Sequence, residues 1–183
     1  TAYALISYRT AYLKANYPVE FMAALMTSER DNIDKVAFYI DESQRMGIQI
    51  LPPSINESFS KFTVVGNAIR FGLGAVKNVG HGAIDSIVTA RNNGGNFKNL
   101  YDFCERVDLG LVNRGVLEAL IKCGVFDSTG AMRKALLVIL DDALTYGARA
   151  SADRRAGQMS LFGGGDGAVP KTEPKVPSLE WTE

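Results

Sequence analysis

The sequence predicts a mainly α-helical protein, in which a tandem helix-hairpin-helix module is preceded by further helices and a small β-hairpin and followed by a flexible C-terminal linker. Apolar residues recur at helical spacing over much of the chain up to residue 148. Two short apolar segments flank Gly66-Asn67, which is typical of a hairpin between two strands. After residue 148, glycine, proline and charged residues become frequent, which is typical of a linker.

The N-terminal part predicts three consecutive helices. The first spans residues 1–17, and Pro18 ends it and can open a second helix near residues 19–27. A third helix begins after Asp31, which is an acceptable N-cap, and Gly47 is a plausible C-terminal stop. Residues 48–50 alternate in polarity and run into a rigid, extended Leu-Pro-Pro break.

The rest of the chain predicts a β-hairpin followed by helices with glycine turns between them. The strands are residues 62–65 and 68–71, and the helices are residues 73–77, 82–92, 100–105, 113–122 and 129–148. We therefore divide the chain into residues 1–50, residues 51–148 with the tandem module, and the linker at residues 149–183.

The net charge is zero, but the basic residues are unevenly spread. Residues 61–100 contain one acidic residue, Asp85, against five basic ones: Lys61, Arg70, Lys77, Arg91 and Lys98. This local excess of positive charge supports contact with a polyanion.

Nothing in the residue pattern indicates a membrane, secreted or zinc-binding protein. No apolar run approaches the roughly 20 residues that cross a bilayer, and no signal peptide opens the chain. Cys104 and Cys123 form no Cys-x-x-Cys pair, so we expect reduced thiols in a cytoplasmic protein. The lone histidine, His81, has no second ligand nearby, so no metal site is expected. Because Thr1 lies within a helical pattern, we expect an internal piece of a longer protein.

The most informative segment is a hairpin in which Val79, Gly80, His81 and Gly82 separate two predicted helices. Glycine tolerates positive φ and lets another molecule approach, so we expect Gly80 and Gly82 to form the turn. The amides of such a turn can bind a nucleic-acid phosphate, and Lys77 can add a charged contact. Such a grip reads phosphates and not bases. The DNA contacts we predict are Lys77, Asn78, Val79, Gly80, His81, Gly82, Arg91 and Lys122.

Simpler interpretations stay open at each of these positions. Gly-x-Gly can be only a tight turn between helices, and His81 can be a solvated loop residue. A second helix-turn-helix lacks Gly-x-Gly, and we expect it mainly to pack, with Asp127 in a capping segment. Its basic residues are either weaker DNA contacts or a solvated basic face: Lys122, Arg133 and Lys134.

Five segments resemble, in the same order, the bacterial DNA polymerase III alpha subunit, a replicative C-family polymerase. They are residues 2–14, 17–25, 51–56, 69–80 and 120–127. The resemblance implies that residues 1–50 are the C-terminal end of a fingers domain and that residues 51–148 are a DNA-binding domain. It also implies that the parent is a DNA-directed DNA polymerase, a nucleotidyltransferase that acts in DNA replication.

The resemblance implies no catalytic residue in this chain. The family's palm domain carries aspartates that hold magnesium ions, and no such cluster occurs here. We therefore expect the chain to bind double-stranded DNA, the primer-template duplex, without extending it and without a cofactor of its own. The family often has an acidic residue in the hairpin where this chain has His81. This difference in side chain leaves the geometry of the backbone amides intact.

A short segment in the linker, Gln158-Met159-Ser160-Leu161-Phe162, resembles the family's sliding-clamp-binding motif. Leu161 and Phe162 can enter an apolar pocket while Gln158 makes polar contacts. A chance pentapeptide, or an apolar pair that folds back on the domain, is the alternative. The partners implied are the β sliding clamp and other polymerase III holoenzyme subunits.

Two other functions compete with a DNA- and clamp-binding part of a polymerase. A stand-alone helix-hairpin-helix repair or accessory protein would explain the hairpin, but it has no need of the fingers-like N-terminal segment. A purely structural helical domain would explain the glycine turns, but not the basic residues around Gly80.

Overall fold

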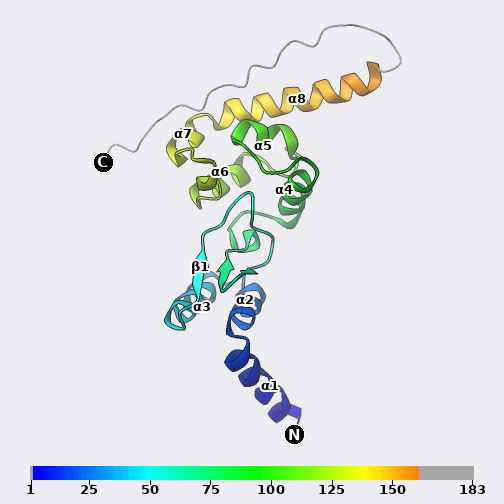
Figure 1. Ribbon diagram of the computed structural model, residues 1–183. Coiled ribbons are helices and arrows are strands. Elements are labelled where there is room, and N and C mark those ends of the chain that lie inside the picture. The colour runs from blue at the N-terminus through cyan, green and yellow to red at the C-terminus, as the bar shows by residue number, and fades with distance from the viewer. Residues whose placement is uncertain (1, 161–183) are drawn as a thin grey trace. The chain divides into compact units, whose positions relative to one another are not determined.

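The computed structural model describes residues 2–160, without the side chains of residues 2, 155 and 157–160. It confirms a mainly helical protein with one small sheet (Figure 1). The chain divides within one helix into two compact units, Thr1–Ile84 and Asp85–Glu183. The division into residues 1–50, 51–148 and 149–183 stays a prediction. None of the described helices is both long and apolar enough to span a bilayer.

The first unit begins with the three predicted helices, α1 (Ala2–Asn16), α2 (Pro18–Ser28) and α3 (Ile33–Arg45). Pro18 occupies the first turn of α2, where its missing N–H costs nothing. The N-cap of α3 is Asn32 and not Asp31, because the Asn32 side chain accepts from the Lys35 N–H at 3.2 Å. Gly47 has a φ of 77°, which confirms it as the stop after α3.

The sheet of the first unit has three strands in the order β1-β3-β2. The predicted hairpin is confirmed as β2 (Thr63–Val65) antiparallel to β3 (Ala68–Arg70), with Gly66 at a φ of 61°. The sequence did not predict β1 (Gln49–Leu51), which pairs in parallel with β3. Ile69 lies opposite both Ile50 and Val64 and is fully buried.

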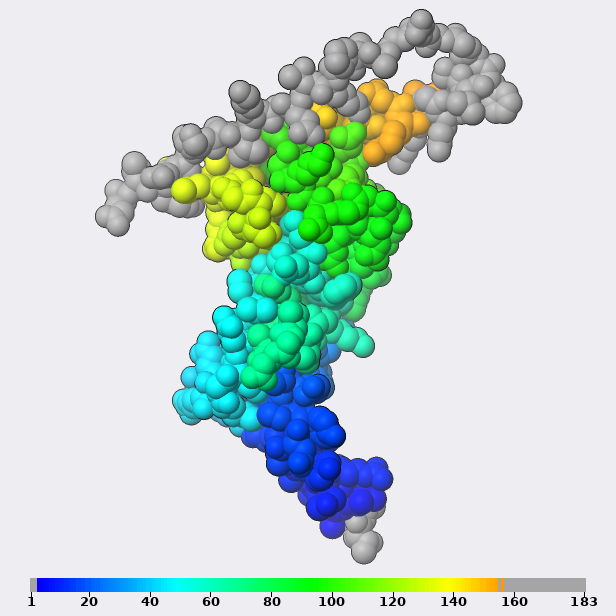
Figure 2. Space-filling view, viewed as in Figure 1, coloured from blue at the N-terminus to red at the C-terminus, as the bar shows by residue number. Residues whose placement is uncertain are grey.

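The core of the first unit lies between the sheet and the helices α2 and α3. Its buried members are Val19, Met22, Ala23, Met26, Val36, Ile48, Phe62, Ile69 and Ala75. The Thr27 hydroxyl accepts from the Phe62 N–H at 3.1 Å, which ties α2 to the start of the hairpin. Helix α1 stands outside this core: Tyr3 and Tyr8 are 86% and 66% exposed, and Figure 2 shows no other element of the unit over α1.

The second unit contains most of α4 (His81–Gly94), then α5 (Leu100–Arg106), α6 (Arg114–Lys122), α7 (Arg133–Val138) and α8 (Leu140–Ser160). The single helix expected at residues 129–148 is instead η2 (Asp127–Thr129), α7 and α8. Helix α8 also continues to Ser160, where we expected a linker from residue 149. Alanine and arginine are frequent between residues 148 and 156, and their high helix propensity accounts for this extension.

Aromatic rings and one arginine organise the second unit. Phe103 contacts Phe97 and Phe126 edge-on, with ring centroids 4.9 and 5.1 Å apart. The Arg106 guanidinium lies 4.4 Å from the Phe97 ring centre and donates to the Ala90 carbonyl at 2.8 Å. It also donates to the carbonyls of Gly95 and Asn96 and pairs with Asp102 at 3.1 Å. Arg106 thus supplies hydrogen-bond donors at the C-terminal end of α4.

Helix α8 lies along α5, and Gly147 permits this close approach (Figure 1). A Cβ on Gly147 would lie 2.6 Å from the carbonyl carbon of Cys104 and 3.0 Å from its Cβ. Because one of these atoms belongs to the backbone of α5, a larger side chain would push the two helices apart.

We expect Gly147→Val to destabilise the second unit by about 1–3 kcal/mol, the usual cost of overpacking a close helix contact. The midpoint of urea unfolding measures this. Ala148→Val is the matched control, because Ala148 lies next in the same helix and is exposed. Equal midpoints for the two variants would contradict the packing described for Gly147.

Candidate nucleic-acid interface

The first hairpin runs from η1 (Leu73–Ala75) through a short connection into α4. Val79 is buried at 8% exposure and its N–H donates to the Val76 carbonyl at 3.3 Å, so the connection is anchored in its unit. The residue with positive φ is Asn78, at 69°, and not Gly80 or Gly82 as the sequence suggested. Asparagine tolerates the left-handed region better than most residues, so it can take the turn position assigned to glycine.

The N-terminal end of α4 leaves backbone amides open. The first backbone hydrogen bond of the helix runs from the Ile84 N–H to the Gly80 carbonyl, at 3.2 Å. The preceding N–H groups, of His81, Gly82 and Ala83, therefore have no carbonyl within the helix to bond. Gly80 holds the capping position and has no side chain to accept from them. His81 and Gly82 are exposed, so an anion can reach their amides.

Space around the hairpin favours close approach by a ligand. A Cβ on Gly80 would meet nothing within 4 Å. Beside the hairpin lies a groove of about 450 Å³, lined by Arg30, Asp31, Ile33 and residues 74–79. Lys77 belongs to this lining and is exposed. The groove therefore combines two cationic side chains and one carboxylate with the residues of the turn.

Arg30 is a member of the site that sequence reasoning missed. It follows α2, and its Nη2 lies 2.9 Å from Nε2 of His81. The two residues are 51 positions apart. No local spacing or motif could have joined them, because only the folded unit brings the α2–α3 connection to the start of α4.

Two of the predicted DNA contacts, Arg91 and Lys122, belong to the second unit. Arg91 is 7% exposed and makes interactions within the protein, so its guanidinium offers little surface to a phosphate. Lys122 is exposed and pairs with Glu118 at 2.6 Å. An exposed ion pair of this kind is weak, so Lys122 could exchange its partner for a phosphate.

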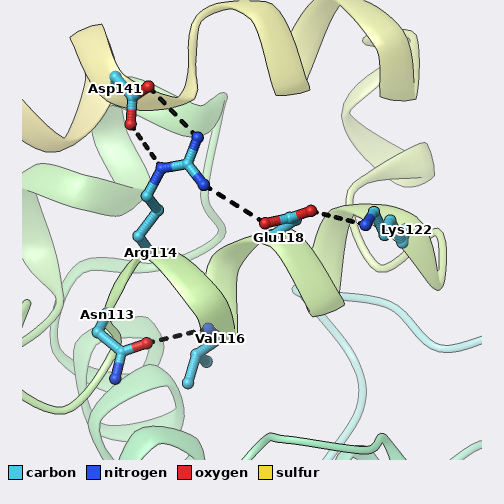
Figure 3. A network of polar contacts seen from close by, with 6 residues as sticks. All are labelled: Asn113, Arg114, Val116, Glu118, Lys122 and Asp141. Atoms are coloured by element: carbon cyan, nitrogen blue, oxygen red, sulfur yellow. Dashed lines mark hydrogen bonds and ion pairs between the residues drawn. The ribbon is translucent and has the colours of Figure 1, made fainter.

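The second hairpin is held together by polar contacts around α6 (Figure 3). The Asn113 side chain caps α6 by accepting from the Val116 N–H at 3.1 Å. Arg114 donates to Asp141 of α8 at 2.8 Å, and its hydrogen bond holds the pKa of the Asp141 carboxyl below its usual value. In the same way, Lys122 lowers the pKa of the Glu118 carboxyl. These contacts favour a packing role for the second hairpin.

One side chain of the second hairpin differs from its predicted role, and two predicted weak DNA contacts also interact within the protein. Asp127 does not cap a helix: its carboxylate accepts from Arg133 Nε at 3.0 Å. Arg133 also donates to the Lys122 carbonyl at 3.3 Å. The guanidinium of Arg133, which we predicted as a weak DNA contact, is therefore hydrogen-bonded within the protein. Lys134, the other weak candidate, also interacts within the protein.

Comparison with known proteins assigns the chain. Residues 47–136 match the model of the helix-hairpin-helix motif. DNA polymerase III subunit alpha of Vibrio cholerae serotype O1 is 45% identical over 100% of this chain. The proteins of that name from Mycobacterium tuberculosis and Escherichia coli K12 are 43% and 48% identical over 99% and 88% of it. The chain belongs to the DNA polymerase III alpha subunit family. It spans 16%, 16% and 14% of the lengths of these three relatives.

The two cysteines of this chain are poor nucleophiles. Burial raises the pKa of the Cys104 thiol to about 12 and also raises the pKa of Cys123. Thiolate, the reactive form, is therefore scarce at neutral pH. Among the described residues, no group of three or more His, Cys, Asp or Glu side chains is placed to hold a metal ion.

The segment that resembles the family's clamp-binding motif begins at the end of α8. Gln158, Met159 and Ser160 lie in the last turn of this helix. Leu161 and Phe162 lie outside the described residues. The motif therefore stays a prediction from the sequence.

The positive φ of Asn78 restricts which residues the first hairpin can accept at this position. We expect Asn78→Val to raise the free energy of the folded hairpin by about 1–2 kcal/mol, because a β-branched residue is strained at positive φ. Asn78→Gly is the matched control and should not destabilise the hairpin. Hydrogen exchange at the Val79 amide reports the local opening, and equal protection in both variants would refute the assignment.

Proposed function

We propose that this chain is the DNA-binding part of a bacterial replicative DNA polymerase large subunit, and that it grips the duplex backbone without sequence preference. One observation carries the proposal: the open amides of His81 and Gly82 lie at the start of α4, inside the segment that matches the helix-hairpin-helix motif. Donors of this kind suit a phosphate oxygen, which every nucleotide presents.

The chemistry of the hairpin favours backbone contact over base reading. Amide donors and the Lys77 ammonium recognise charge and geometry, and neither selects among base edges. Lys77, Asn78, Val79, Gly80, His81 and Gly82 form one continuous segment, with Val79 buried as its anchor. Lys122 is a secondary contact in this proposal, and buried Arg91 acts through packing. Affinity should fall steeply with salt, because binding releases counterions from DNA.

We propose that the natural protein performs template-directed DNA synthesis as a nucleotidyltransferase in the cytoplasm. Nucleotidyl transfer of this kind uses magnesium held by converging carboxylates. The residues described here do not provide such a site. The metal would therefore be held by another part of the natural protein, and this chain would hold the primer-template duplex.

A stand-alone helix-hairpin-helix repair or accessory protein is the alternative. Such a protein would share only the motif with the polymerase. The similarity to the Vibrio cholerae protein covers the whole chain, including the residues before the motif begins at residue 47. This extent favours the polymerase.

We also propose that Gln158-Met159-Ser160-Leu161-Phe162 binds the β sliding clamp and so links the polymerase to other holoenzyme subunits. The support comes from the sequence. Two adjacent apolar anchors follow a polar residue and precede Gly163-Gly164-Gly165. A short peptide of this composition can place Leu161 and Phe162 in an apolar pocket.

Replacing Gly80 and Gly82 together by valine should weaken DNA binding by at least about tenfold, since a hydrogen bond to a charged group is worth roughly 1.5–3 kcal/mol. The valine side chains would keep the phosphate away from the amides. Fluorescence anisotropy with labelled duplexes of unrelated sequence, over a salt series, measures the effect.

Ala24→Val, on an exposed position of α2, is the control for adding the same side chain elsewhere in the first unit. Circular dichroism should show unchanged helicity in both variants. If the double glycine variant binds like the control, the hairpin is not the grip. A strong preference among the duplexes would contradict backbone recognition.

Changing Leu161 and Phe162 to alanine should abolish binding of the natural full-length chain to a sliding clamp, because both apolar anchors are removed. Surface plasmon resonance with immobilised clamp measures this. A variant with alanine at Val169 and Val176, apolar residues of the same C-terminal segment, should bind normally. Undiminished binding by the Leu161/Phe162 variant would refute the motif.

A further inference from the structure

The contact between Arg30 and His81 joins a residue outside the recognised motif to a residue inside it. Its Nη2–Nε2 distance is 2.9 Å. A guanidinium only donates, so Nε2 of His81 is the acceptor in this contact. The motif match begins at residue 47, so it does not include Arg30. The contact places the charged end of Arg30 beside the first residue of α4.

The backbone of the first unit makes room for this placement. The Arg30 Cδ lies 3.5 Å from the point that a Cβ on Gly74 would occupy. The Ser60 carbonyl oxygen lies 2.6 Å from the same point, and the Ser60 hydroxyl oxygen lies 3.1 Å from it. Gly74 thus lets the Arg30 side chain and the Ser60 backbone pack together at this point. Arg30 and Lys77 then line the same groove.

Arg30 differs electrostatically from the other arginines near turns of this protein. Arg70, Arg106 and Arg133 each pair with a carboxylate. Within residues 2–160, no carboxylate lies within 4.0 Å of the Arg30 guanidinium, although Asp31 also lines the groove. Arginine has five N–H donors, and His81 takes one. The others can form the two-pronged contact that suits a phosphodiester.

We propose that Arg30 is a phosphodiester ligand of the first hairpin and that His81 positions it. The inference rests on the proposed DNA-binding function and extends the grip beyond the helix-hairpin-helix motif. The amides of His81 and Gly82 hold one side of the phosphate, and the guanidinium of Arg30 holds another. His81 acts as the acceptor that keeps the arginine turned toward the hairpin.

The first test compares Arg30→Gln with Arg45→Gln in the full natural chain, by anisotropy with a short DNA duplex over a salt series. Arg45 lies in the same unit, at the end of α3, and pairs with Asp41 of its own helix. We expect Arg30→Gln to weaken binding about tenfold and to reduce the salt dependence by about one ion, with little change for Arg45→Gln. Equal behaviour of the two variants would overturn the role of Arg30.

The second test separates positioning from direct contact by His81. His81→Leu removes the acceptor, whereas His81→Gln retains one. We expect the leucine variant to weaken binding several-fold and the glutamine variant to restore it. In an Arg30→Gln background, His81→Leu should have no further effect. An additional loss in that background, or no loss in the single leucine variant, would overturn the positioning role.

The glycine hairpin variants distinguish this inference from the function on which it rests. If Gly80→Val/Gly82→Val loses binding while Arg30→Gln behaves like Arg45→Gln, only the role of Arg30 fails. If the hairpin variant and Arg30→Gln both bind DNA normally, the proposed DNA-binding function and the proposed role of Arg30 both fail.

Discussion

The need of helix ends for hydrogen-bond partners governs the structure around α4. Three other helices, α3, α5 and α6, are capped by an asparagine at the N-terminus. The side chains of these residues accept a hydrogen bond from an amide of the first turn: Asn32, Asn99 and Asn113. Helix α4 follows Gly80, which has no side chain to offer. At its other end, Arg106 donates to carbonyls of the last turn and of the residues just beyond it. Backbone carbonyls at the C-terminus of α4 thus have hydrogen-bond partners, whereas the amides at its N-terminus do not. The proposed ligand would bind at this N-terminal end.

Much of the fold was predictable because its elements are coded locally. Pro18 and Gly47 mark helix boundaries through their own backbone preferences, and Gly66 marks the hairpin. The strand β1 was missed because parallel pairing joins residues distant in sequence. The interruption between α7 and α8 at Ile139 carries no glycine or proline signal. The extent of α8 was underestimated because the glycines after residue 162 outweighed the alanine-rich stretch before them.

The candidate site was predictable only in part, for a similar reason. The hairpin residues follow one another in the sequence, and the turn could be located from its two glycines. Its left-handed position fell instead on Asn78, since a residue other than glycine can take that conformation. Arg91 was assigned from charge alone, and charge does not reveal burial. Arg30 required the folded unit, which joins the α2–α3 connection to the start of α4.

A glycine before α4 has a thermodynamic consequence. With glycine as the cap residue, the first turn of the helix lacks the stabilisation of about a few tenths of a kcal/mol that a capping side chain adds over glycine. A bound anion would supply it, so ligand occupancy and helix order become linked functions. Part of the free energy of anion binding would then stabilise the first turn, because a ligand that binds only the ordered turn shifts the equilibrium toward it. Ligand affinity and the stability of the first turn of α4 would therefore change together.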